Sequence, residues 1–268
     1  MRKSASTPFF KTLCFCPIRI YFSRYKHVRL VHCPKKPPMN WNAIIGIAAT
    51  LALFLPVALI IAFRLYYNRS LQALLIYNFF GLIYNLMVQG IITMPVIARK
   101  IFGTAYNYLD TPLMLLFLIF FCTGTCRIKV IFRVLIFFLF YEMIIGFIYG
   151  FSPQANVYVL GPGIIIILFF SIIFFIRQIK MTIVYSKGLG KTLMLASVVF
   201  SYGCFFLIYI FHYIQKIDAV KDIFLLYYIA SFITSVLMSF GLVFINRHLK
   251  QLDEVKVARK ELQMFFNT

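Results

Sequence analysis

Residues 130–150 read VIFRVLIFFLFYEMIIGFIYG, an almost wholly apolar run with one acid, Glu142, inside it. A run of about 20 apolar residues spans the hydrocarbon of a bilayer as a helix, because a helix satisfies its own backbone hydrogen bonds. An ionised carboxylate in hydrocarbon is costly, so such a residue is neutral, paired or turned towards a wet cavity. We expect Glu142 to be the only Asp or Glu inside an apolar span. It is predicted either to bind a ligand or proton, or to link neighbouring helices as a protonated side chain.

The composition extends this prediction to the whole chain. Of its 268 residues, 62% are hydrophobic and 13% are charged, whereas a soluble domain has about 25% charged residues. The sequence therefore predicts an all-α, polytopic membrane bundle. The net charge of +20 is spread over the short loops, where Lys and Arg face anionic lipid head groups. This distribution does not favour nucleic acid as a partner.

Seven apolar spans follow a basic N-terminal arm. They are residues 43–63, 71–92, 110–126, 130–150, 157–176, 192–214 and 223–245. The third span is predicted to begin at Asp110-Thr111-Pro112, because Asp caps a helix well and Pro is tolerated in its first turn. The fifth span is predicted to be broken or kinked at Gly161-Pro162-Gly163. The short connections predict antiparallel neighbours in a membrane domain of residues 39–245.

The arm, residues 1–38, differs from the rest of the chain. It contains nine Lys or Arg, no acid and no uninterrupted apolar run. Its composition superficially resembles an organelle transit peptide. We favour an over-extended start with Met39 as the initiator, and otherwise expect a disordered arm.

The positive charges also predict the orientation. The loops after the first, third and fifth spans, the C-terminal tail and Arg133 at the start of the fourth span hold fourteen Lys or Arg, against four in the other loops. Positive loops remain in the cytoplasm, so residue 39 is predicted outside and the C-terminus in the cytoplasm. Counting the arm on the outer side would nearly cancel this difference.

Polar side chains in three spans form a candidate ligand site. In the second span, Asn78, Asn85 and Gln89 lie on one helix face, and the sixth span carries Tyr209 and His212 towards its outer end. With Glu142, these residues predict an outward-opening pocket for a small ligand. The alternative is that they only hydrogen-bond neighbouring helices.

No catalytic or metal site is predicted. Cys122 and Cys126 lie on one helix face without a His or carboxylate beside them. Serines at helical spacing in the last two spans indicate close helix packing, because no base accompanies them. We therefore expect a protein that is not an enzyme and has no cofactor.

The tail, residues 246–268, shows a helical pattern in which Leu249, Leu252 and Val255 share a face. It predicts a short cytoplasmic amphipathic helix that continues the last span or turns along the membrane. The pattern is too short to specify a coiled coil.

The last span is followed by Arg247-His248-Leu249-Lys250-Gln251-Leu252. This segment resembles the start of a cytoplasmic signalling helix. Residues 39–262 resemble uncharacterised bacterial seven-helix membrane proteins and, in architecture, the membrane sensor portion of seven-helix histidine kinases. The resemblance implies a non-catalytic sensor or accessory subunit of the inner membrane, signalling through its C-terminal helix to a cytoplasmic protein. The alternative is a small-solute or proton-coupled transporter that uses Glu142.

Overall fold

A computed structural model describes residues 41–268 except 123–124, 151, 186–187, 216–219 and 267–268. Seven α-helices account for most of this described part. They are α1 (Trp41–Ala62), α2 (Arg69–Val88), α3 (Val96–Leu118), α4 (Thr125–Tyr149), α5 (Pro153–Tyr185), α6 (Leu189–Tyr209) and α7 (Val220–Phe266). The predictions for the arm, residues 1–38, lie outside the described residues.

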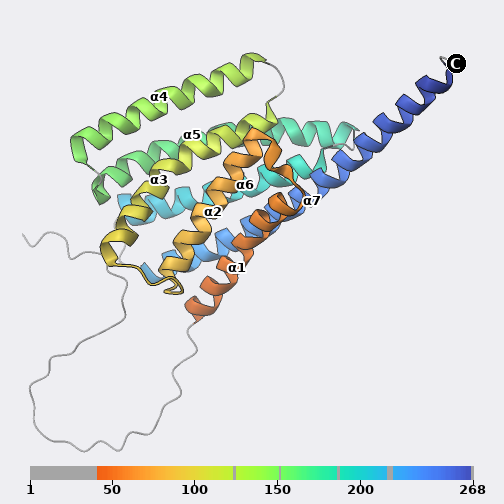
Figure 1. The fold of residues 1–268 in the computed structure, drawn as a ribbon. Helices are drawn as coiled ribbons and strands as arrows, with labels where there is room; N and C mark the ends of the chain where they lie inside the picture. The colour runs from red at the N-terminus through yellow and green to blue at the C-terminus, as the bar shows by residue number, and fades with distance from the viewer. Residues whose placement is uncertain (1–40, 123–124, 151, 186–187, 216–219, 267–268) are drawn as a thin grey trace, which may run out of the picture. The chain divides into compact units, whose positions relative to one another are not determined.

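The helices form one bundle in which neighbours in sequence pack together (Figure 1). Helices α6 and α7 lie along each other, α1 covers α7, and α5 covers α6. Helices α2 and α3 form a hairpin beside them, and α4 packs against α3 and α5. The membrane-compatible part of α4 is the least buried of the seven.

All seven helices are long and apolar enough to cross a membrane. Their outward side chains are also apolar, with Phe137 75% exposed and Phe147 86% exposed on α4. Large rings would be unfavourable in water at this density, but lipid accommodates them. The predicted all-α bundle of seven membrane helices is therefore confirmed.

Helix α3 begins much earlier than the sequence pattern predicted. It starts after Pro95 and continues through Asp110-Thr111-Pro112, so Asp110 lies inside the helix instead of capping it. Asp110, Thr111 and Pro112 are all buried. The expectation that Glu142 is the only acid within a span is therefore wrong. The charges of Arg99 and Lys100 lowered the hydropathy of the first half of this helix and hid its start.

Helix α5 runs without interruption through Gly161-Pro162-Gly163. The predicted break is therefore wrong. A proline lacks the N–H that would bond the carbonyl four residues earlier, and neighbouring helices can supply a replacement donor in a membrane bundle. Tyr141 of α4 supplies it here, as its hydroxyl donates to the Tyr158 carbonyl at 2.9 Å.

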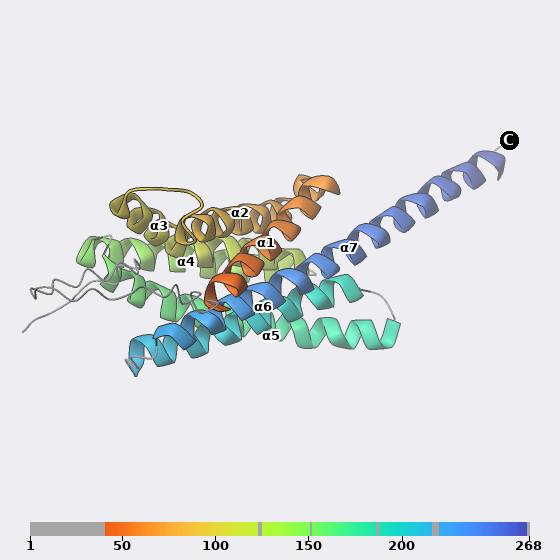
Figure 2. The same ribbon diagram turned by 90° about the horizontal axis from the view of Figure 1, so that it is seen from below.

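The last span and the tail form a single helix of 47 residues. Figures 1 and 2 show α7 extending well beyond the ends of the other helices. Its membrane-compatible part is Leu225–Gln251, and the helix continues from there to Phe266. The predicted tail helix is therefore a direct extension of α7 and not a separate element.

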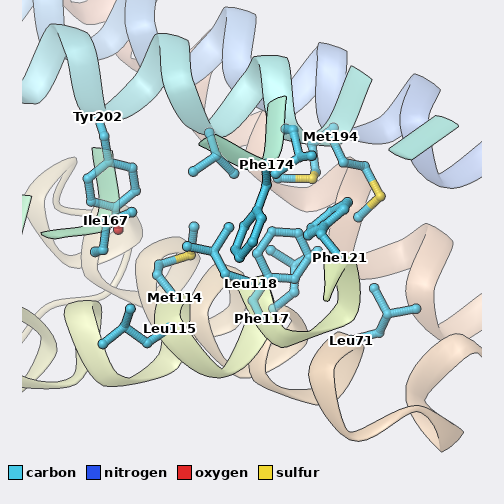
Figure 3. Packing of buried hydrophobic residues seen from close by; sticks show 14 of the residues in the cluster. Leu71, Met114, Leu115, Phe117, Leu118, Phe121, Ile167, Phe174, Met194 and Tyr202 are labelled. Atoms are coloured by element: carbon cyan, nitrogen blue, oxygen red, sulfur yellow. The ribbon is translucent and has the colours of Figure 1, made fainter. Parts of the chain in front are cut away.

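An apolar core fills the half of the bundle near the α1–α2 and α3–α4 connections. Figure 3 shows Phe117, Phe121 and Phe174 turned towards one another at its centre. Helices α2, α3, α5 and α6 all contribute to this core, with Leu71, Met114, Ile167 and Met194 among its members. Apolar side chains therefore fill the interior of this half of the bundle.

Small residues bring α6 and α7 together, as their spacing predicted. Ser235 and Ser239 donate to carbonyls of their own helix at 2.7 Å, so their side chains project little from the surface of α7. Gly190 and Gly241 make the closest approach, because a Cβ on Gly190 would lie 2.7 Å from the Gly241 carbonyl oxygen. Such contacts are typical of helix packing in membranes.

Candidate functional site

Asp110 is the centre of a buried polar cluster that joins three helices. The Tyr202 hydroxyl of α6 donates to its Oδ1 atom at 2.8 Å. The Tyr77 hydroxyl of α2 interacts electrostatically with the same carboxyl group. Asp110 is buried and Tyr202 fully so. The Tyr202 hydroxyl satisfies a polar group that would otherwise be costly to bury.

Tyrosine rings surround this carboxyl group. The Tyr106 ring stacks between those of Tyr77 and Tyr84, with centroid distances of 5.9 Å to each. On the other side, Phe205 lies 5.7 Å from Tyr202 and 5.8 Å from Tyr227. Offset and edge contacts of this kind favour a fixed arrangement. The rings thereby connect α2 with α3 and α6 with α7, and the hydrogen bond from Tyr202 to Asp110 joins the two pairs.

The second-span amides lie in the same half of the bundle. Asn78 and Asn85 are buried and donate to carbonyls of α2, Leu74 at 2.9 Å and Gly81 at 3.0 Å. The Asn85 amide also reaches the Tyr227 hydroxyl at 3.5 Å. These amides therefore lie within the tyrosine-rich region, and Asn85 faces α7.

Gln89 follows α2 at its C-terminal end and lies between α1 and α7. Its side chain fills the space where a Cβ of Gly46 would project. The Tyr228 hydroxyl of α7 lies beside this side chain. The absence of a side chain at Gly46 thus gives the amide room to reach across from α2.

Glu142 lies on α4 and faces α3. Its side chain is only 5% exposed, and within the described part of the chain its Oε1 atom has no hydrogen-bond partner. It interacts electrostatically with two groups of α3, Asp110 and Tyr108. A buried carboxyl oxygen without a donor is compatible with a neutral acid and costly for an ionised one.

Tyr209 and His212 lie at the end of α6. The Tyr209 hydroxyl donates to the Val157 carbonyl of α5 at 3.2 Å, and a Cβ on Gly161 would lie 2.5 Å from that hydroxyl. His212 lies in the π-helical turn Ile210–Ile214, with its ring 4.7 Å from the Tyr213 ring. Turns of this kind are frequent at functional sites.

The predicted site residues therefore fall into two regions on different sides of α3. Asn85 and Gln89 approach Tyr227 and Tyr228 of α7, and Asn78 is buried on α2, whereas Glu142 lies on α4 and Tyr209 contacts α5. Asp110 relates the two regions, since it accepts a hydrogen bond from Tyr202 of α6 and interacts electrostatically with Glu142 of α4. Ligand binding by these six residues stays a prediction.

The Gly-Pro-Gly segment of α5 is a docking point for three helices. Tyr141 of α4 bonds the carbonyl that Pro162 leaves free, and Tyr209 of α6 fits over Gly161. Thr111 of α3 occupies the space beside Gly163 that a Cβ would fill. The prolines of α3 and α5 are therefore brought close together, with Thr111 directly before Pro112.

Replacing Tyr141 with phenylalanine is expected to destabilise the bundle by about 0.6 kcal/mol, the usual value for a hydrogen bond between membrane helices. Pro162→Ala would restore a backbone N–H for the Tyr158 carbonyl and make the tyrosine hydroxyl redundant. Unfolding in mixed micelles of wild type, both single variants and the double variant measures this coupling. An equal loss from Tyr141→Phe in both backgrounds would contradict the assignment.

The described part of the chain has no three His, Cys, Asp or Glu side chains placed to hold a metal ion. The chemistry that the site offers is hydrogen bonding and proton exchange at Asp110 and Glu142.

Seven apolar helices around a polar, tyrosine-rich centre define a multi-pass integral membrane protein. No family model, curated protein or solved structure matches the chain.

Proposed function

We propose that the protein is a non-catalytic, receptor-like sensor whose polar centre acts on α7. The observation that carries this proposal is the continuity of α7. One uninterrupted helix contributes Tyr227 beside Asn85 at one end of the bundle and continues past the other helices to Phe266. A change around Tyr227 thus acts on the same rigid element that forms the tail.

The packing of α7 supports movement as a unit. Its backbone meets that of α6 directly at Gly241, and Ser235 and Ser239 donate to carbonyls of α7 itself, so these two hydroxyls do not tie α7 to α6. Helix shifts of small amplitude are a known means of signalling through packed helices. A ligand or proton in the centre would need to favour one of two α7 positions to produce a signal.

The proposal places the tail in the cytoplasm of a bacterium and the protein in its inner membrane. Its support is the excess of Lys and Arg in the tail and in the loops on the same side. The partner is then a cytoplasmic signalling protein that contacts the extension of α7. The architectural resemblance to kinase-associated sensors favours the same arrangement.

A tag after Thr268 allows the partner to be recovered from native membranes by cross-linking. Tag-matched truncation after Lys250 is expected to abolish recovery. Insertion of Gly-Pro between Gln251 and Leu252 is a control, because it retains the tail but interrupts the helix. We expect this variant to keep the partner and lose the signal. Equal recovery with and without the tail would contradict the proposal.

A proton-coupled transporter is the second candidate. Two buried acids lie beside the proline-containing segments of α3 and α5, and broken or weakened helices line many transport sites. Solute uptake into vesicles, driven by a pH gradient and lost in Glu142→Gln, would favour this function. The sensor proposal predicts no such uptake.

A further inference from the structure

We propose that Glu142, with Tyr108 and Asp110 of α3, forms a proton-binding site whose occupancy holds α4 against the rest of the bundle. The inference supplies a signal for the proposed sensor, but it does not depend on the tail having a partner. Its ligand is a proton, exchanged with water and bound at the Glu142 carboxylate.

The environment of the Glu142 carboxyl group favours a bound proton. The group is buried between α4 and α3, and its Oε1 atom meets no donor among the described residues. Asp110, by contrast, receives a hydrogen bond from the Tyr202 hydroxyl. The structure thus stabilises a carboxylate at Asp110 much better than at Glu142. A proton on Glu142 removes the cost of burying its charge.

The groups close to Glu142 do not neutralise its charge. Tyr108 and Asp110 of α3 interact with it electrostatically. The charged residues of α5, Arg177 and Lys180, lie in the half of that helix distant from Pro162. The sequence of α5 therefore offers no cation near Glu142, while Asp110 contributes like-charge repulsion.

Helix α4 is held to the bundle on one side only. It packs against α3 and α5 and is the least buried span. Tyr141, the residue before Glu142, fastens it to the Tyr158 carbonyl of α5 by one hydrogen bond. A charge on Glu142 would therefore arise directly beside the Tyr141 hydrogen bond that holds α4 to α5. Loss of the proton favours outward movement of α4, because outside the interface the carboxylate can reach water or lipid head groups.

Spin labels measure this movement in the full-length chain in nanodiscs, with the six native cysteines replaced. One label at Phe147 of α4 and one at Phe79 of α2 occupy exposed positions. From acidic to alkaline pH, we expect the docked population to fall by about tenfold and a longer distance to appear. A pair at Leu51 and Phe79, on α1 and α2, is the control and should not change.

Glu142→Gln is the matched variant, since glutamine has nearly the shape of a protonated glutamate and cannot ionise. It should hold the acidic-pH distance at every pH and remove one pH-dependent carboxylic acid band from the infrared spectrum. A pH-independent distance in the unsubstituted background, or an unchanged response in Glu142→Gln, would overturn the proposal. Asp110→Asn provides a second test, because removal of its charge should weaken the response without abolishing it.

Discussion

Replacement of Gly241 by alanine is expected to destabilise the bundle by about 2 kcal/mol. The added Cβ would lie 2.9 Å from the Gly190 carbonyl oxygen and 3.1 Å from the Met194 backbone nitrogen. Backbone atoms cannot rotate away, so α6 and α7 must separate. Overpacking of this kind costs about 1–3 kcal/mol, and the better helix propensity of alanine offsets up to about 1 kcal/mol. Thermal or detergent unfolding measures the loss.

Gly203→Ala is the matched control on α6. No atom outside its own helix neighbourhood lies within 4 Å of the position that its Cβ would occupy. Alanine there should leave stability unchanged or raise it by up to about 1 kcal/mol. Gly190→Ala combined with Gly241→Ala should cost less than the sum, because both fill the same gap. Equal effects at Gly241 and Gly203 would contradict the close approach of α6 and α7.

Asp110→Ala is expected to have the larger effect, about 3 kcal/mol. It leaves the buried Tyr202 hydroxyl without its acceptor and removes the carboxyl group with which Tyr77 interacts. Each buried polar group that loses its partner costs about 1–3 kcal/mol, and the lost side chain adds a small cavity. Reversible unfolding in mixed micelles gives the value directly.

Asp110→Asn separates hydrogen bonding from charge. Its amide oxygen can still accept from Tyr202, so we expect a loss of about 1 kcal/mol. Tyr202→Phe should behave similarly, since Tyr77 remains. If Asp110→Ala unfolds like the wild type, the carboxyl group does not hold α2, α3 and α6 together.

The sequence was sufficient to predict the seven membrane helices, because their apolar runs are long and their connections short. All six candidate site residues lie in or directly beside helices whose bounds were nearly right, α2, α4 and α6. Hydropathy failed where a helix contains both polar residues and a proline. In α3, Tyr106 and Asp110 face the centre of the bundle, so their polarity indicates a buried cluster and not a loop.

The partners of the site could not be read from the sequence. Tyr202 and Asp110 are far apart in the chain, and only the folded bundle lets the Tyr202 hydroxyl of α6 reach Asp110 of α3. One signal was available within α3, where Tyr106 and Asp110 are one helical turn apart. The role of Tyr141 likewise depends on α4 lying beside the carbonyl that Pro162 frees.

Coupling between the polar centre and the extension of α7 is the central claim, and hydrogen–deuterium exchange of residues 246–266 tests it most directly. Exchange in this segment should differ between acidic and alkaline pH in the wild type, after correction for the intrinsic rate. The Glu142→Gln variant should remove that difference while it leaves exchange in α1 and α2 unchanged. A tail whose corrected exchange is the same at both pH values, in a protein whose α4 does move, would contradict the claim.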